Sequence, residues 1–235
     1  MERQDGRDII WVVGSPKCGN TWLSRLIAEA LDCPIGGSWR EDRQMFKTPP
    51  ATEGLKRPGG YWIYQEHLTE KPHAPNQKIV VINRDPRDAI VSTMYYWELP
   101  NINSAINKGM DRWKSMVDFW IFQPRADSYV SYEQLKDNAV SHLGRILTEI
   151  DTPPAKRIDH VVKNQEFHNK RKYVAKHGDS MPHGTPLQMK MLRKGIVGDW
   201  KNHFTKNDAK RVHSELFNHM NILGYEHDPD WWRKV

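Results

Sequence analysis

Short apolar runs alternate with amphipathic segments along the chain. Residues 8–14 and 79–83 are continuous and rich in Val and Ile, which is typical of strands buried on both faces of a parallel sheet. Residues 61–66 and 127–132 are rich enough in β-forming residues to predict two further strands. Helical periodicity and cap residues predict helices at 20–31, 86–97, 111–122, 133–150, 155–163 and 206–222. The alternation predicts an α/β fold with a parallel sheet flanked by helices.

Two stretches lack a clear period. Residues 36–60 and 173–198 are rich in Gly, Pro and charge, and the sequence predicts long loops there, of the kind that often serve as lids or binding segments. The chain has 235 residues, of which 38% are hydrophobic. This length and composition predict a single domain over residues 1–235.

Composition narrows the classes of function. No apolar run approaches the roughly 20 residues of a membrane helix, and the start MERQDGRD is charged, so we expect a soluble cytoplasmic protein without a membrane partner. Cys18 and Cys33 are too few for a disulfide framework or a cysteine-rich zinc site, and we expect both to stay reduced. The net charge of +6 favours anionic partners without choosing among them. The basic run at 163–176 is typical of a solvated face.

A glycine-bearing turn follows the first predicted strand and precedes the first predicted helix. Gly14 to Thr21 has the G-x4-G spacing and terminal Thr of a nucleotide-binding P-loop. A strand that feeds such a turn presents unpaired backbone N–H groups and a helix dipole to an anion. We therefore predict that this loop holds a phosphate, with an ordinary glycine turn as the alternative.

Departures from two known loop types sharpen this prediction. An NTPase loop has Lys directly after the second Gly, whereas this chain has Asn20 there and carries Lys17 inside the loop. The strand at 79–83 runs into Arg84 where an acidic Mg²⁺ partner would be expected, so no metal is predicted. A phosphatase loop is disfavoured because Arg25 lies one step too far from Cys18, which is interpreted as a small loop residue.

Three motifs carry a resemblance to a known family. The segment SPKCGNTWL resembles the 5′-phosphosulfate loop YPKSGTTW of cytosolic-type sulfotransferases. The segments VINRDPRDAIVSTMYY and RKGIVGDWKNHFT resemble that family's 3′-phosphate segment RNPKDVAVSYY and its C-terminal cofactor loop RKGxxGDWKxxFT. The resemblance implies a short member with the P-loop nucleoside-kinase-like sulfotransferase fold. It also implies 3′-phosphoadenosine 5′-phosphosulfate (PAPS) as sulfuryl donor and 3′-phosphoadenosine 5′-phosphate (PAP) as product.

The resemblance assigns a set of candidate cofactor-binding residues. They are Lys17, Cys18, Gly19, Asn20, Thr21, Trp22, Arg84, Ser92, Tyr132, Phe167, Arg193, Lys194 and Gly195. A nucleotide with phosphates at both the 5′ and 3′ positions needs two anion sites, and fixed cations suit the second of them. Trp22 could stack on adenine, with a plain core role as its alternative.

The chemistry implied is an in-line sulfuryl transfer to a hydroxyl or amine of a small acceptor. Lys17, beside the 5′-phosphate, is predicted to neutralise the leaving group. His67 in YWIYQEHL matches the family's catalytic base, with strand-end capping as its alternative. The family's lysine two places before the base is replaced by Gln65, which leaves the rate and the acceptor class open.

Two other functions compete with this interpretation. A P-loop nucleotide kinase or NTPase would require magnesium, and a catalytically silent nucleotide-binding protein would show no turnover. The basic charge comes with no recognisable nucleic-acid motif, so no nucleic-acid partner is predicted. Residues 205–210 lack the family's TVxxxE dimer pattern, which predicts a monomer or a dimer of another kind.

Overall fold

A five-stranded parallel sheet forms the centre of the structure, a computed structural model that describes residues 8–38, 60–67, 69, 77–178 and 184–235. The strands are β1 (Asp8–Val13), β2 (Ile35–Ser38), β3 (Tyr61–Glu66), β4 (Gln77–Asn83) and β5 (Ser128–Ser131). Their order is β2-β3-β1-β4-β5, and every neighbouring pair is parallel. The two strands with continuous Val and Ile, β1 and β4, lie side by side, as expected for strands covered on both faces.

The strand order reverses at β1. From β1 the chain first builds β2 and β3 on one side, and then crosses to β4 and β5 on the other. In open α/β sheets a ligand crevice opens where two connections leave the carboxyl ends of neighbouring strands in opposite directions. The carboxyl ends of β1 and β4 are therefore the place where this fold offers a site.

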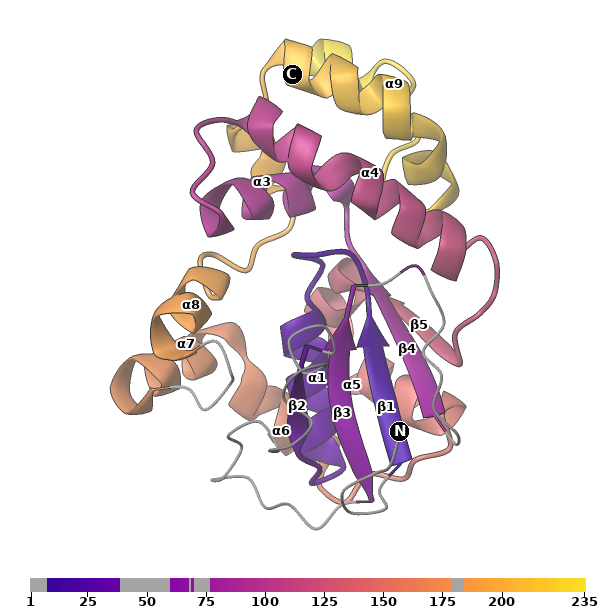
Figure 1. Cartoon of the computed structure of the whole chain (residues 1–235), viewed down its shortest axis with the longest axis vertical. Helices are drawn as coiled ribbons and strands as arrows, with labels where there is room; N and C mark the ends of the chain where they lie inside the picture. The colour runs from indigo at the N-terminus through magenta and orange to yellow at the C-terminus, as the bar shows by residue number, and fades with distance from the viewer. Residues whose placement is uncertain (1–7, 39–59, 68, 70–76, 179–183) are drawn as a thin grey trace.

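Most helices form two groups around the sheet (Figure 1). Their bounds are α1 (Asn20–Ala30), α3 (Pro86–Tyr96), α4 (Ile102–Trp120), α5 (Tyr132–Glu149), α6 (Ile158–Gln165), α7 (Phe167–His177), α8 (Gly184–Met191) and α9 (Lys206–Ile222), with 3₁₀ turns η1 (Asp199–Asn202) and η2 (Trp231–Lys234). Helices α1, α5 and α6 share one apolar core with the sheet, while α3, α4, α9 and η2 build a second core above its carboxyl edge. Helices α7 and α8 lie apart from both groups (Figure 1). The site region lies between these two cores.

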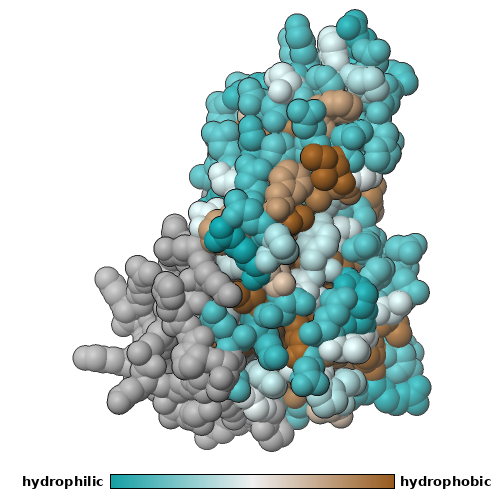
Figure 2. All heavy atoms as spheres, turned by 90° about the vertical axis from the view of Figure 1, so that its right-hand side faces the viewer, coloured by the Kyte–Doolittle hydropathy of each residue, from teal (hydrophilic) through white to brown (hydrophobic). Residues whose placement is uncertain are grey.

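The second face of the sheet is covered by the end of α4. Met116 and Trp120 pack with Trp11 of β1 and with Ile79 and Val81 of β4. The side of the molecule that lies to the right in Figure 1 is largely hydrophilic, and hydrophobic atoms gather near its mid-height (Figure 2). Among the helices that the structure describes, none is both long and apolar enough to cross a membrane.

Most predicted elements are confirmed. The four predicted strands correspond to β1, β3, β4 and β5, and the helices predicted at 20–31, 86–97, 133–150 and 206–222 correspond to α1, α3, α5 and α9. Gly224, with a φ of 77°, follows the end of α9 as a helix stop does. The helix predicted at 155–163 lies later, at Ile158–Gln165.

Three predictions were wrong. The helix predicted at 111–122 begins at Ile102, where Asn101 caps it by accepting a hydrogen bond from the Ser104 N–H. The loop predicted at 173–198 contains the end of α7 and all of α8. Residues 36–38 fall in the loop predicted at 36–60 but belong to β2, whose pairing with β3 overrides their low strand propensity. The remainder of that loop prediction, 39–59, lies outside the described residues.

Candidate active site

The phosphate loop lies between β1 and α1 and is fixed at both ends. A Cβ on Gly14 would lie 2.2 Å from the Ile82 carbonyl oxygen of β4, so only glycine fits there. Gly19 caps α1 with a φ of 105° and without a side-chain hydrogen bond. The Asn20 side-chain amide donates to the carbonyls of Gly14 and Glu66 at 3.2 and 3.5 Å. The side chain of Asn20 therefore fixes the loop, and its backbone N–H lies at the helix N-terminus where an anion would bind.

Lys17 projects from this loop into a positively charged environment. Its φ of 70° is the left-handed region, and its ammonium lies 3.7 Å from the centroid of the Tyr96 ring. Burial, together with the positive charges of Arg84 and Arg193, lowers the pKa of Lys17 to about 7. An amine with this pKa changes its charge readily near neutral pH, and a nearby anion would favour its protonated form.

Cys18 is a loop residue whose side chain is turned into the protein interior. It is fully buried, and burial raises the pKa of its thiol to about 12. Its sulfur lies 4.0 Å from Asn83 Oδ1, and its backbone N–H donates to the Ser15 carbonyl. A protonated, buried thiol is a poor nucleophile, which supports the interpretation of Cys18 as a small loop residue. Both cysteines are free thiols in the structure.

His67 lies at the carboxyl end of β3, beside the phosphate loop. Its Nδ1 lies 2.6 Å from the Gly14 carbonyl oxygen, which can only accept a hydrogen bond. The proton of a neutral imidazole is therefore on Nδ1, and Nε2 carries the lone pair that can accept another proton. Arg112 of α4 donates to the backbone carbonyl of His67 at 3.1 Å. These two contacts hold the residue from both sides.

Gln65 occupies the place of the family's second lysine. Its Oε1 accepts a hydrogen bond from the Thr21 hydroxyl at 3.0 Å, so the strand end and the start of α1 are joined by neutral groups. The Thr21 hydroxyl also lies 3.7 Å from the sulfur of Met191 at the end of α8. The Lys17 ammonium is therefore not accompanied by a second cation from position 65.

Arg84 directly follows β4, and its side chain lines the cavity. Its guanidinium stacks on the Tyr132 ring at 4.2 Å, donates to the Ile196 carbonyl at 2.9 Å and lies 3.5 Å from the Asp88 carboxylate. The Tyr132 ring also contacts Gly19, where a Cβ would lie 2.8 Å from it. One tyrosine therefore joins the phosphate loop to Arg84, which was predicted to belong to a second anion site.

Arg193 and Lys194 converge on one carboxylate. Asp199 accepts from Arg193 at 2.6 Å and from Lys194 at 2.9 Å. Burial works against ionisation of Asp199, but the hydrogen bonds from the two cations outweigh it and hold the pKa of Asp199 well below its usual range. The segment that carries them is tied to α3, because Asp88 accepts from the backbone N–H groups of Gly198 and Trp200 at 2.7 and 3.0 Å.

Gly195 and Phe167 are in direct contact. Gly195 has a φ of 65°, and a Cβ there would lie 2.6 Å from the Phe167 ring. The absence of a side chain at 195 is therefore required by the neighbouring ring of α7 as well as by the backbone. The structure therefore brings together two residues that were predicted from separate segments of the sequence.

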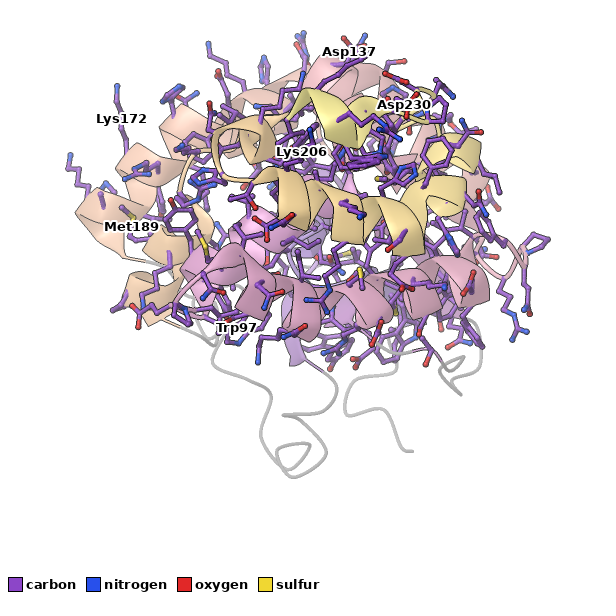
Figure 3. All side chains as sticks on the ribbon, turned by 90° about the horizontal axis from the view of Figure 1, so that it is seen from above. Trp97, Asp137, Lys172, Met189, Lys206 and Asp230 are labelled. Carbon is purple, nitrogen blue, oxygen red and sulfur yellow. The ribbon has the colours of Figure 1, made fainter. Side chains whose placement is uncertain are left out.

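A cavity of about 770 Å³ joins these groups. The predicted site residues that line it are Lys17, Gly19, Asn20, Thr21, Trp22, His67, Arg84, Ser92, Tyr132, Phe167, Arg193, Lys194 and Gly195. Cys18 is not among the lining residues. The cavity also reaches Trp97 and Asp137, which lie on opposite sides of the molecule in Figure 3. A site of this extent can hold two ligands end to end.

Sequence reasoning missed several residues of the site. Asp88 and Asp199 position the cationic segment, and Tyr96 and Arg112 line the cavity beside Lys17 and His67. The acidic residue within GDWK was a usable signal, because a carboxylate so near two cations is a probable ion-pair partner. Nothing in the local sequence pattern marks Arg112, which reaches the site only through the packing of α4.

The structure offers no metal centre within its described ranges. Among these residues no group of three or more His, Cys, Asp or Glu side chains is arranged to hold a metal ion. The positive charge that the cavity presents to a ligand comes from lysine and arginine side chains.

Comparison with known proteins identifies the family. The profile described as "Sulfotransferase domain" matches residues 62–224, which is more than half of the chain. The chain belongs to this sulfotransferase family. The match begins after the phosphate loop and contains both of the other motifs, at 81–96 and 193–205. The alternative that this chain belongs to a family of nucleotide kinases is therefore wrong.

Curated relatives agree with this assignment. Sulfotransferase 2B1 of Mus musculus is 24% identical over 230 residues, which cover 84% of this chain and 67% of that protein. Sulfotransferase 1E1 of Rattus norvegicus is 24% identical over 247 residues, which cover 91% of this chain and 83% of that protein. Both alignments extend over nearly the whole of the present chain.

Solved structures confirm the fold class. Mouse sulfotransferase SULT7A1 complexed with PAP superposes with a TM-score of 0.66 at 19% identity, covering 91% of this chain and 85% of that one. Retinol dehydratase in complex with androsterone and PAP gives a TM-score of 0.64 at 13% identity, covering 90% and 80%. The parallel sheet flanked by helices is the sulfotransferase fold.

Proposed function

We propose that this protein transfers the sulfuryl group of PAPS to a hydroxyl or amine of a small acceptor, as a single domain over residues 1–235. The observation that carries the proposal is one cavity lined by the phosphate loop, by His67 and by the cations Arg84, Arg193 and Lys194. Family membership supplies the reaction class. The relatives of known structure described above are complexes with PAP, which supports the same nucleotide here.

The nucleotide would span two anion sites. The 5′-phosphosulfate would lie on the backbone N–H groups at the start of α1, beside Lys17, where the helix dipole also favours negative charge. The 3′-phosphate would lie among Arg84, Ser92, Arg193 and Lys194, all of which line the cavity. Arg193 and Lys194 would then exchange part of their ion pairing with Asp199 for the phosphate.

The adenine would lie between these two sites and the face of α5. Trp22 is half-buried, lines the cavity and meets the Tyr132 ring edge to face at 5.6 Å. A ring held in this way can stack on a base at little conformational cost. Phe167, against Gly195, lines the same cavity from α7.

The reaction would proceed by in-line displacement at sulfur. The acceptor oxygen or nitrogen forms a bond to sulfur while the bond from sulfur to the 5′-phosphate oxygen breaks. His67 Nε2 takes the acceptor proton, because its Nδ1 proton is held by the Gly14 carbonyl. The Lys17 ammonium stabilises the charge that develops on the leaving phosphate. The products are the sulfated acceptor and PAP.

The acceptor would enter beside His67. Tyr96, Trp97 and Met191 line the cavity, so an apolar or aromatic small molecule fits that end better than a polymer. Retinol dehydratase, a structural neighbour, has been solved with retinol and with androsterone. We propose that the protein is cytoplasmic and acts without a nucleic-acid or membrane partner. We also propose that it is a monomer, or a dimer that does not use residues 205–210, which here form the cap and first turn of α9.

Transfer of label from sulfur-labelled PAPS to a panel of phenols, sterols, amines and sugars tests this function. We expect a labelled product with at least one acceptor, formation of PAP in equal amount, and no loss of rate in EDTA. A strict magnesium requirement would contradict the proposed mechanism. Tight PAP binding without turnover on any acceptor would favour the catalytically silent alternative.

A further inference from the structure

The last turn of α3 and the residues directly after it contact cations from three separate segments. Tyr96 lies under the ammonium of Lys17 at 3.7 Å, and the neighbouring Tyr95 lies under the guanidinium of Arg193 at 4.2 Å. Just beyond the helix, Glu98 pairs with Lys190 of α8 at 2.5 Å. These cations come from the phosphate loop, the C-terminal cofactor segment and α8. The carboxyl end of a helix itself favours positive charge, so the turn is well suited to hold them.

The two rings are held in place by other groups. Trp97 meets Tyr96 edge to face at 4.8 Å, and His203 meets Tyr95 in the same way at 5.5 Å. A cation prefers the face of an aromatic ring, where the ring quadrupole is negative. Each ring therefore has an aromatic neighbour on one side and a cation over its face.

The surroundings of Lys17 destabilise its charged form, so a favourable contact for the ammonium matters here. Arg84 and Arg193 repel it, and burial disfavours its charged form. A ring face attracts an ammonium without forming the strong ion pair that would keep it from a phosphate. The contact therefore fixes the position of the cation while leaving its charge available to a ligand.

We infer that Tyr96 and Tyr95 are positioning residues, which hold Lys17 and Arg193 over the cavity through their ring faces. The inference rests on the proposed roles of these cations at the leaving phosphate and at the 3′-phosphate. Tyr96 acts through Lys17 and Tyr95 acts through Arg193. The last turn of α3 thereby sets the spacing between the two anion sites.

The decisive pair of variants is Tyr96→Leu, which removes the ring, and Tyr96→Phe, which keeps it. With Tyr96→Leu we expect kcat to fall by about three- to thirtyfold, the range of a cation–π contact, while KM for PAPS changes less than threefold. Tyr96→Phe should restore kcat to within about twofold of the parent, because the ring face is kept. Tyr95→Leu should instead raise KM for PAPS with little effect on kcat.

A second readout does not depend on activity. The pKa of Lys17 can be followed by competitive acetylation of the protein with acetic anhydride at several pH values, read by mass spectrometry. Loss of the ring should lower it by about half a unit to one unit in Tyr96→Leu, and Tyr96→Phe should retain it. Phe122→Leu, which removes an exposed ring that does not line the cavity, is the control for loss of an aromatic side chain.

The outcomes separate this inference from the proposed function. A Tyr96→Leu protein with parental Lys17 pKa and parental kcat would overturn the inference. A lowered Lys17 pKa with unchanged kcat would support the contact and overturn the role of Lys17 in the reaction. If Tyr96→Leu does not fold, Tyr96→Met offers a longer apolar side chain for the same measurements. Equal losses in the Leu and Phe variants would also overturn the inference, because they would assign the effect to the hydroxyl.

Discussion

The phosphate loop and the C-terminal segment at 193–200 both bring cations to the cavity, but they hold them differently. Lys17 rests on an aromatic ring among other positive charges, and its pKa is lowered to about 7. Arg193 and Lys194 are paired with the buried carboxylate of Asp199. Asp88 then fastens the backbone of that segment to α3. The phosphate loop thus carries a cation whose pKa is lowered, and the C-terminal segment carries cations that are paired with a buried carboxylate.

This difference suits two tasks. A cation that stabilises a leaving group contributes most when its interaction strengthens in the transition state. Cations that anchor a nucleotide should bind it equally in the ground and transition states, which changes affinity and leaves kcat unaltered. We therefore expect variants near the phosphate loop to act on kcat, and variants at the second anion site to act on binding.

The largest effect is expected from His67→Ala. Loss of a general base should lower kcat by about 10²- to 10⁴-fold while the dissociation constant of PAP stays within a few-fold. The measurement is single-turnover transfer from labelled PAPS, with PAP binding followed by calorimetry. His67→Asn offers a matched control, because its amide can still donate to the Gly14 carbonyl but has no comparable basicity. If His67→Asn turned over normally, the group would be structural.

Lys17→Met should come next. It removes the ammonium and keeps an apolar side chain of similar length over Tyr96, so kcat should fall by about 10²- to 10³-fold, as for other groups that stabilise developing charge. PAP binding should weaken less than kcat falls. Steady-state kinetics and calorimetry on the same preparation make the comparison. An equal loss in binding and in kcat/KM, with kcat unchanged, would place Lys17 among the anchoring cations.

Arg84→Ala should act mainly on binding. A phosphate left without its charged partner costs about 2–4 kcal/mol, which is about thirtyfold or more in the dissociation constant of PAP. Adenosine 5′-phosphate, which lacks the 3′ group, should lose less affinity than PAP does. Arg84→Lys, which keeps a charge but not the planar stack on Tyr132, should be intermediate. Equal losses for the two nucleotides would place Arg84 outside the 3′-phosphate site.

The pH dependence of binding tests the titrating cation. In the free protein the pKa of Lys17 is about 7, and bound phosphate should raise it because the anion favours the ammonium. Between pH 7 and the raised value, PAP binding should take up a proton and affinity should fall as pH rises, by at most about tenfold per unit. Calorimetry at pH 8 in two buffers of different ionisation heat measures this uptake. Lys17→Met should lack it, and the same uptake in that variant would assign it to another group.

The sequence predicted the elements whose pattern is local. Strands β1 and β4 are continuous apolar runs, and Pro86 is an ordinary helix-start signal for α3, as Asn101 is for α4. The early turns of α4 carry Ile102, Ala105 and Ile106 at helical spacing, so the missing nine residues could have been found. β2 could not be found, because its strand conformation comes from pairing with β3.

The candidate site divides in the same way. Motifs supplied Lys17, His67 and Arg193, since each stands in a segment with a recognisable spacing. Tyr96 contacts Lys17 only because the end of α3 packs near the phosphate loop in the folded protein. No pattern within the local sequence predicts that tertiary contact. Residues that position other residues through long-range contacts are therefore the part of a site that cannot be predicted from a single sequence.

The buried carboxylate of Asp88 has a consequence for the order in which the chain folds. It accepts hydrogen bonds from the backbone N–H groups of Gly198 and Trp200, which follow it in the sequence by 110 and 112 positions, so docking this segment onto α3 closes a long loop. During synthesis the phosphate loop, the sheet and α5 can assemble before Gly198 leaves the ribosome. The proposed second anion site is completed only afterwards, because Arg193 and Lys194 belong to the same late segment. Nucleotide present at that stage would act as a folding ligand, drawing the late segment onto a sheet that has already formed.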